Sequence, residues 1–447
     1  MIEFLTKEST KVSIDLEPYH RFHSYCARFP SEVAESAISA YSKPGDSVSD
    51  PFCGSGTTLV AGLALKRRVV GSDIDVLAGM ISELKCAARP TPHYQQWQKR
   101  FERKLRDVFR DIESGWSDAL TLRAGEEISF PSIQFKLPTL PIIEYWFPPR
   151  LRAALAAISK AAHECHDPHF ENVALVTLSA AVIAKWPNSL SYAMDIDHTR
   201  PHRRIRRFQL TKVLETYLKR LDRTITCLGS LGETFQEIGI QENSSDLYRV
   251  ICPHDARKPL SSVSDESQTL IVTSPPYFNA VDYPRAHRLS VCWMNGRAPA
   301  DLTSRSKYIG LHQAPGFDAI AWLDDRSEVR NLLPPVVIEQ PMIRRRLAAF
   351  YADLETVLKE IHRQLRPGGY AVFVIGDNVI KGNRIASHSA LVQIAQSLGF
   401  TKKAVDSREI GGMRRRYPVG QFGFDGPLTH EFVVVLQKPK EKREIHA

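Results

Sequence analysis

The sequence has little that would tie it to a membrane or to an oxidising compartment. Its longest mostly apolar run, residues 173–184, is about half as long as a bilayer-spanning helix. The first ten residues, MIEFLTKEST, contain acids and no apolar stretch, unlike a secretory signal or a transit peptide. The seven cysteines are odd in number and widely spaced, and none form a Cys-x-x-Cys pair, so neither a disulfide framework nor a zinc ribbon is indicated. These absences predict a protein of the reducing cytoplasm with no membrane role.

The composition is that of a folded protein. Of the 447 residues, 43% are hydrophobic and 24% are charged, far from the regime of disordered chains. The length suits roughly three ordinary domains or one large, elaborated domain. Lys and Arg outnumber Asp and Glu by 59 to 50, a net charge of +9, which favours a polyanionic partner but suits a soluble basic enzyme equally well.

A glycine-rich loop lies between a strand and a helix near the N-terminus. Residues 47–49 predict a short strand, the loop DPFCGSGTT follows, and residues 57–65 suit a helix. A second strand, 68–72, ends at Asp73, which completes a βαβ unit. Such a loop allows close backbone approach and supplies free N–H donors to a ligand with a carboxylate and a ribose. A dinucleotide is disfavoured, because Leu59 stands where a third small residue is needed.

The rest of the chain divides into a helical part and a second α/β part. We expect the first part of the α/β domain at 1–80, a helical insertion at 81–243 and the second part at 244–447. The fold class is therefore α/β, a doubly wound, mostly parallel sheet with a large helical insertion and an antiparallel terminal strand pair. The patterns predict helices at 151–162, 172–186, 208–228 and 345–365, strands at 247–252, 269–273, 370–377, 400–410 and 430–438, a helix cap at 366–369 and a loop-rich region at 278–340.

Two motifs together carry a family resemblance. The loop DPFCGSGTT followed by GSDID, together with TSPPY at 273–277, resembles the S-adenosylmethionine-dependent DNA amino-methyltransferases, which modify N4 of cytosine or N6 of adenine. The segment HSYCARFP (23–30) resembles the part of that family that covers the methionine end of the cofactor. The resemblance spans about 20–90 and 245–440. It implies a methyltransferase-like fold, S-adenosylmethionine as cofactor and duplex DNA as partner, and it leaves a cognate restriction endonuclease open.

The resemblance also implies roles for individual residues. Asp73 would hold the ribose, and its alternative is a loop acid that caps the next helix. Asp255 would contact the adenine amino group, with a turn or N-cap acid as the alternative. Asp50 would lie near the methionine amino group. The remaining residues expected to line the cofactor are Phe52, Gly54, Gly56 and Thr57.

The Ser-Pro-Pro-Tyr motif suits an exocyclic amine. Such an amine is a poor nucleophile, because its lone pair is delocalised into the ring. The hydroxyl of Ser274 and the carbonyl of Pro275 can accept its two N–H hydrogens, while Pro275 and Pro276 stiffen the loop. Tyr277 can stack on a base flipped out of the duplex. Without the glycine loop upstream, the motif would indicate only a rigid turn.

The serine of this motif favours cytosine N4 as the target. Within the resembling family, Ser before Pro-Pro is typical of cytosine-N4 enzymes, whereas Asp or Asn is more usual in adenine-N6 enzymes. A neutral Ser274 also predicts that the active site contributes no carboxylate. A cytosine-C5 enzyme is not indicated, because no Pro-Cys dipeptide supplies a nucleophile. Adenine-N6 methylation, methylation of an RNA amino group and a non-catalytic nucleic-acid-binding protein remain alternatives.

Basic segments are the candidates for DNA contact. Residues 198–223 contain nine Arg or Lys and two acids, which suits phosphate contacts or a solvated helix face about equally. We expect the helical insertion and the loops at 278–340 to recognise the DNA target. The dense group HECHDPHF at 163–170 lacks a second ligand pair, so no metal is expected. The basic residues expected to contact DNA are Arg203, Arg204, Arg206, Arg207, Arg414, Arg415 and Arg416.

Overall fold

The computed structural model places most of the chain. It describes residues 14–25, 28–117, 120–184, 188–192, 208–241, 246–278, 283–294, 308–309, 317–380, 382–409 and 430–440. Within these ranges, no helix is both long and apolar enough to cross a membrane.

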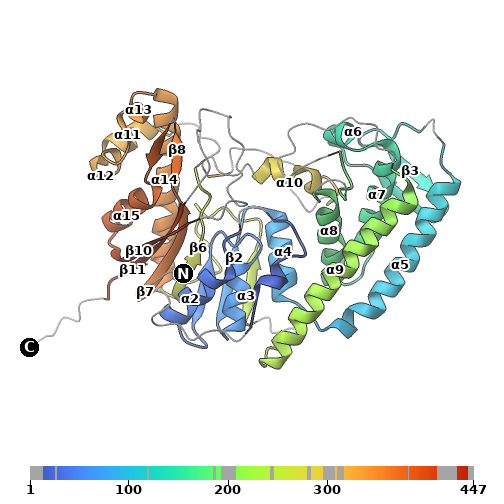
Figure 1. The fold of residues 1–447 in the computed structure, drawn as a ribbon, viewed down its shortest axis with the longest axis horizontal. Helices are drawn as coiled ribbons and strands as arrows, with labels where there is room; N and C mark the ends of the chain where they lie inside the picture. Colours follow the sequence, from blue (N-terminus) through green and yellow to red (C-terminus); the bar gives the residue numbers. More distant parts are fainter. Residues whose placement is uncertain are drawn as a thin grey trace, which may run out of the picture.

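A seven-stranded sheet forms the centre of the molecule (Figure 1). Its strand order is β10-β11-β7-β6-β1-β2-β5, so the chain order reverses between β1 and β6. Neighbouring strands are parallel from β5 to β7, and only β11 and β10 add antiparallel pairs. The mostly parallel sheet with a terminal antiparallel pair is confirmed. The strands are β1 (Ser47–Asp50), β2 (Arg68–Ser72), β5 (Tyr248–Ile251), β6 (Gln268–Thr273), β7 (Leu365–Gly376), β10 (Thr401–Glu409) and β11 (His430–Gln437).

Alternate residues of the central strands pack on opposite faces of the sheet, because side chains of a strand alternate in direction. Val272 packs on the face covered by α2 (Ser31–Tyr41) and α3 (Thr57–Ala64). Ile271, the preceding residue of β6, packs with α14 (Pro341–Gln364) and α15 (Ser387–Ser397). Burial on both faces explains why β6, β7 and β11 contain continuous apolar runs, at 270–272, 371–375 and 432–436, rather than alternating patterns.

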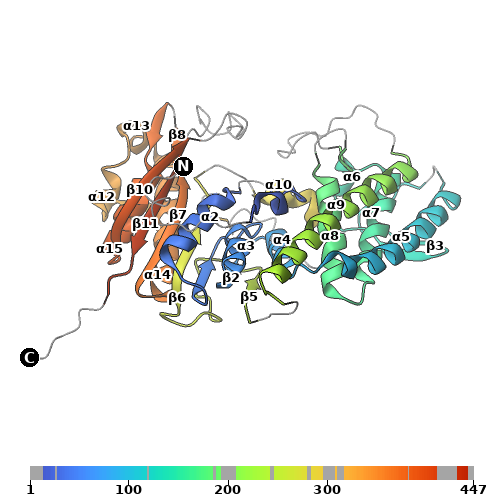
Figure 2. The ribbon, with the colours of Figure 1, turned by 60° about the horizontal axis from the view of Figure 1, so that its bottom comes forward.

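The helical insertion packs as a body beside the β5 edge of the sheet (Figures 1 and 2). Its α4 packs on α3 and β5 and also on α8, and so links the sheet to the helices. The insertion is not wholly helical, because a short hairpin, β3 (Glu127–Phe130) with β4 (Ile133–Lys136), lies within it. Its helices are α4 (Val76–Cys86), α5 (Thr91–Ser114), α6 (Ile142–Trp146), α7 (Pro149–His163), α8 (Pro168–Val182) and α9 (Leu210–Glu237).

Two sequence-based expectations about the second half were wrong in part. The region 278–340 contains helices as well as loops. One of them, α11, is capped by Asp318, which accepts from the N–H groups of Ile320 and Ala321. Residues 366–369 do not cap a helix but lie inside β7, where Gly368 donates to the carbonyl of Lys438. The remaining elements are η1 (Glu17–His20), α10 (Tyr283–Val291), α11 (Ala319–Asp324), α12 (Ser327–Arg330), α13 (Pro335–Ile338), β8 (Asn378–Ile380) and β9 (Asn383–Ile385).

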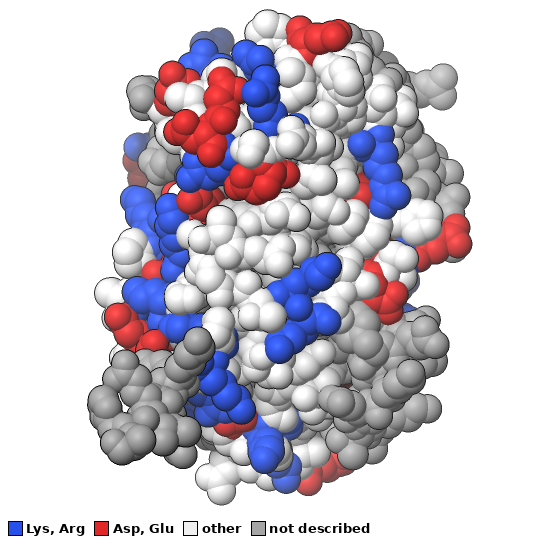
Figure 3. Space-filling view, turned by 90° about the vertical axis from the view of Figure 1, so that its left-hand side faces the viewer, with Lys and Arg blue, Asp and Glu red and all other residues white. Residues whose placement is uncertain are grey.

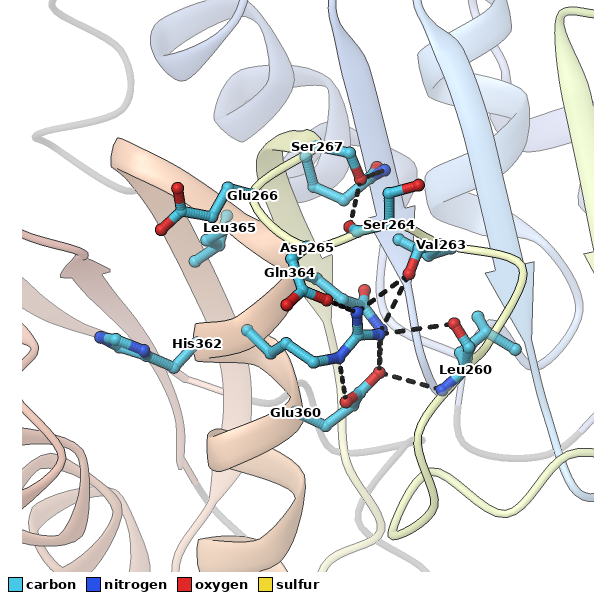
Figure 4. Close-up of polar contacts among 12 residues, drawn as sticks. Leu260, Val263, Ser264, Asp265, Glu266, Ser267, Glu360, His362, Gln364 and Leu365 are labelled. Atoms are coloured by element: carbon cyan, nitrogen blue, oxygen red, sulfur yellow. Dashed lines mark hydrogen bonds and ion pairs between the residues drawn. The ribbon is translucent and has the colours of Figure 1, made fainter.

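An ionic network fixes the end of α14 to the loop between β5 and β6 (Figure 4). Arg363 donates to both carboxylate oxygens of Glu360, at 2.6 and 2.8 Å, and to the carbonyl of Val263 at 3.1 Å. Glu360 also accepts from the N–H of Leu260 at 3.0 Å. The network lies where β6 and β7 begin, and it therefore supports the sheet at the edge away from the strands' carboxyl ends.

Candidate active site

A cleft lies at the carboxyl ends of β1, β2 and β6, where the strand order reverses. This is the edge at which ligands bind in open α/β sheets. The cleft contains about 770 Å³ of empty space, part of it open to solvent, and seven separate stretches of the described chain line it. The lining residues include Tyr25, Arg28, Phe29, Phe52, Gly54, Thr57, Asp73, Asp75, Asp255, Ser274, Pro276, Tyr283 and Tyr308.

Helix α4 packs against the glycine loop and restricts its conformation. Gly54 and Gly56 have positive φ angles of 50° and 81°, which favour glycine. A Cβ on Gly56 would stand 2.9 Å from the Ser82 hydroxyl oxygen, so the close approach of α4 also requires glycine there. Ser82 donates to the carbonyl of Gly54 at 2.8 Å, and Lys85 donates to the carbonyl of Ser55 at 2.6 Å. Both carbonyls are thus bonded to α4.

Lys85 is the residue beneath this loop that sequence reasoning missed. Only 1% of its surface is exposed, and its ammonium lies 2.8 Å from Nδ1 of His20. Burial, followed by the charge of Arg28, lowers the pKa of Lys85 to about 7. In the sequence, Lys85 near the end of an apolar helix resembles an ordinary C-terminal lysine, so nothing there indicates its burial.

Asp73 lies at the end of β2 and faces the cleft. Its Oδ2 accepts from the N–H of Gly54 at 2.9 Å, and its Oδ1 accepts from the N–H of Asp75 at 2.9 Å. Burial, followed by the nearby charge of Asp75, raises the pKa of Asp73 to about 7. The alternative role as a helix cap is wrong, because Asp75, not Asp73, caps α4 by accepting from the N–H of Leu77.

Asp50 lies behind the wall of the cleft rather than on it. It is 1% exposed, and its Oδ1 accepts from the N–H of Phe52 at 3.0 Å and from the hydroxyl of Thr273 at 2.6 Å. Burial raises the pKa of Asp50 to about 6 although both hydrogen bonds lower it. Asp50 thereby joins the glycine loop to the end of β6, next to Ser274. Gly56, the N-cap residue of α3, likewise does not line the cleft.

Asp255 lines the cleft, but its carboxylate is engaged by Arg257. Both guanidinium contacts are short, 2.9 Å to Oδ1 and 2.8 Å to Oδ2, and the N–H of Arg257 also donates to Oδ1. Burial would raise the pKa of Asp255, but the hydrogen bonds and charge of Arg257 outweigh it and hold that pKa below its ordinary value. Asp255 therefore lines the cleft and also accepts hydrogen bonds within a local turn, which was the alternative role.

The segment at 23–30 reaches the same cleft. Tyr25, Arg28 and Phe29 line it, while residues 26 and 27 lie outside the described residues. Arg28 is oriented by Glu17, with 3.0 Å between Nη1 and Oε2. The two parts of the resemblance that are most distant from one another in sequence, 23–30 and 273–277, thus meet at one site.

The Ser-Pro-Pro-Tyr loop starts a chain of hydrogen bonds that leads away from the cleft. Ser274 and Pro276 line the cleft, whereas Pro275 and Tyr277 are not part of its lining. The hydroxyl of Ser274 donates to that of Tyr277 at 3.4 Å, and Tyr277 donates to Oε1 of Glu431 at 3.1 Å. The carboxylate of Glu431 is thus connected to Ser274 through two hydrogen bonds, although Glu431 does not line the cleft. Sequence reasoning missed it because 154 residues separate it from Tyr277.

Helix α10 connects the site to the helical insertion. Nδ1 of His287 is hydrogen-bonded to Oδ2 of Asp75, and both side chains are buried. Three residues further along α10, Ser290 accepts from Ser179 of α8 at 2.8 Å. Beyond the helix, the carbonyl of Trp293 accepts from Ser159 of α7 at 2.6 Å. The insertion is thus in direct contact with the segment that follows the Ser-Pro-Pro-Tyr loop.

The residues expected to contact DNA lie outside the described residues. They are Arg203, Arg204, Arg206, Arg207, Arg414, Arg415 and Arg416. On the face of the molecule in Figure 3, Lys and Arg occur in separate groups, with acidic side chains among them near the top. In the HECHDPHF group, His163 bonds to Glu171 at 2.6 Å and His169 to Tyr94 at 3.0 Å. No group of three metal-ligating side chains occurs in the part of the chain that the structure describes.

The fold and the cleft define an α/β protein with a cleft at the point where the strand order reverses. The family model described as "DNA methylase", for N6 and N4 methyltransferases, matches residues 5–77. Type II methyltransferase M.MvaI of Kocuria varians is 25% identical over 376 residues, which cover 81% of this chain and 77% of the relative. Type II methyltransferase M.BsoBI of Geobacillus stearothermophilus is 23% identical over 431 residues, covering 85% and 78%. The chain is therefore similar to DNA amino-methyltransferases, by the family model over residues 5–77 and by these two relatives over most of its length.

A solved structure similar to this chain is that of a possible DNA modification methylase from Thermus thermophilus, complexed with S-adenosyl-L-methionine. The two chains are 20% identical, with a TM-score of 0.23. The similar part covers 42% of this chain and about half, 53%, of the other.

Proposed function

We propose that this protein transfers the methyl group of S-adenosylmethionine to the exocyclic N4 of cytosine in duplex DNA. One observation carries the proposal: a single cleft is lined both by the glycine loop with Asp73 and by Ser274 with Pro276. A donor and an acceptor of a group must occupy adjoining positions, and in this cleft the two motifs adjoin. The names of the relatives, which are Type II methyltransferases, agree with DNA as the substrate.

The cofactor half of the cleft fits a nucleoside with an amino-acid tail. The ribose would donate to the carboxylate of Asp73, and the walls at Phe52 and Ile74 offer apolar surface for the adenine. Arg28, which also lines the cleft, offers a charge for a carboxylate. When bound, S-adenosylmethionine supplies an electrophilic methyl group on a positively charged sulfur.

The other half of the cleft would hold the amine. Ser274 and the carbonyl of Pro275 would accept its two hydrogens and draw the nitrogen toward tetrahedral geometry, so that its lone pair points at the methyl group. The new N–C bond forms as the C–S bond breaks, its electron pair goes to sulfur, and one amine proton leaves through the accepting groups to solvent. The target base must be flipped out of the duplex to reach this position.

We also propose the helical insertion at 81–243 as the part that recognises the DNA target. Its support is the contact of α7 and α8 with α10 and Trp293, which brings the insertion against the segment that follows the catalytic motif.

The experiment is transfer of a labelled methyl group from S-adenosylmethionine to duplex DNA, with duplex RNA of the same sequence as the comparison. Label in DNA that Ser274→Ala transfers about a hundredfold more slowly supports the proposal. Label in RNA alone would identify an RNA amino-methyltransferase, and cofactor binding without transfer to either would favour a non-catalytic binding protein.

A further inference from the structure

We propose that Glu431, held by Arg408, is a positioning residue for the Ser-Pro-Pro-Tyr loop, an inference that rests on the proposed function. Its carboxylate sets the direction of the hydrogen bonds from Ser274 through Tyr277, so that the Ser274 oxygen faces the substrate amine as an acceptor. The residue lies on the last strand of the sheet, far in sequence from both motifs of the cleft.

The sheet topology brings Glu431 to the site. β11 is antiparallel to β7, so it enters the sheet at the edge where the parallel strands end. Its second residue, Glu431, lies opposite Gly376, the last residue of β7. The first residues of β11 and the loop after β6 therefore share the edge that forms the cleft.

A second strand holds the carboxylate in place. Glu431 lies opposite Arg408 of β10, and Nε of Arg408 donates to Oε2 of Glu431 at 2.8 Å. The other guanidinium nitrogen, Nη2, donates to the same oxygen. Oε1 remains for Tyr277, at 3.1 Å. The two partners thus occupy different oxygens, and neither side chain is more than a quarter exposed.

The number of available hydrogens fixes the direction of the chain. A hydroxyl has one hydrogen, and a carboxylate in an ion pair can only accept. Tyr277 must therefore donate to Glu431, which leaves its oxygen to accept from Ser274. Ser274 donates its only hydrogen to Tyr277, so that its lone pairs are free to accept from an amine. Without Glu431, either hydroxyl could reverse, and Ser274 would then present its hydrogen to the amine that it must activate.

The test uses four proteins: the wild type, Tyr277→Phe, Glu431→Gln and the double variant. Tyr277→Phe keeps the ring and removes the hydroxyl, and Glu431→Gln keeps an acceptor but adds an N–H that can donate to Tyr277. Each single change should lower kcat roughly ten- to a hundredfold, the range for a hydrogen bond to a charged group, with cofactor affinity by calorimetry unchanged. The double variant should be no slower than Tyr277→Phe, because one chain is broken in both.

Glu266→Gln is the matched control. It removes a glutamate from the ion pair with Lys438, just beyond the other end of β11, and should leave kcat at the wild-type value. Thermal unfolding of the four proteins gives a readout without turnover, in which the two changes should also be non-additive.

Two outcomes separate this inference from the function on which it rests. A wild type that transfers no methyl group to DNA would overturn the proposed function. An active wild type whose Glu431→Gln variant keeps the full kcat, or whose double variant shows the product of the two single losses, would overturn the positioning role and leave the function intact.

Discussion

Cofactor affinity should depend on pH through Asp73. In the free protein the pKa of Asp73 is about 7, raised first by burial and then by the charge of Asp75. Ribose hydroxyls donate to a carboxylate, so binding selects the ionised form and returns the pKa toward its ordinary value. Below pH 7, each unit of pH should therefore weaken binding about tenfold. At pH 5 the affinity should be roughly a hundredfold weaker than at pH 8.

Calorimetric titration with S-adenosylmethionine between pH 5 and pH 8 measures this slope. Asp73→Asn should bind more weakly at pH 8 and show a flat profile, because the amide does not titrate. The same variant retains Asp50 and Lys85, whose pKa values of about 6 and about 7 fall in the same range. A tenfold loss per pH unit that persists in Asp73→Asn would refute the assignment of the slope and of the ribose contact to Asp73.

Three further predictions concern stability, turnover and DNA affinity. The pKa of Lys85 is about 7 in the folded protein and near 10.4 in the unfolded chain. Between these pH values the unfolded chain binds more protons, so the free energy of unfolding should rise with pH. Urea unfolding at pH 7 and 9.5 measures this rise, which Lys85→Met should flatten. Ser274→Ala should lower kcat on the order of a hundredfold while calorimetry finds cofactor binding intact, and full activity would contradict the role of its hydroxyl. Neutralising the basic segment 200–207 should flatten the salt dependence of DNA affinity, and an unchanged slope would indicate that the segment is a solvated surface. The residues to neutralise are Arg203, Arg204, Arg206 and Arg207.

Local patterns were sufficient to predict the sheet and the glycine loop. The glycine loop and the strand that ends at Asp73 are contiguous, so their relation follows from the βαβ unit alone. The antiparallel pair at the C-terminus was predicted from the strand-like patterns of residues 400–410 and 430–438, and the structure pairs them as β10 and β11. The hairpin β3–β4 was missed because its strands are only four residues long and lie among strong helical patterns.

The missing parts of the site depend on contacts between distant segments. Glu431 and Lys85 carry no motif, and each acts on its loop from another element of the fold. The occupied carboxylate of Asp255 is a different case, since Arg257 is only two residues away and the sequence CPHDARKP contains both. A local salt bridge could have been predicted there, whereas the reach of β11 to the Ser-Pro-Pro-Tyr loop required the register of the sheet.

The measurement that tests the central claim most directly is mass spectrometry of nucleosides from duplex DNA methylated in vitro by the wild-type protein. The neutral hydroxyl of Ser274 in the cleft predicts N4-methylcytosine as the product, formed about a hundredfold more slowly by Ser274→Ala. N6-methyladenine as the sole methylated nucleoside would contradict the assignment of the base.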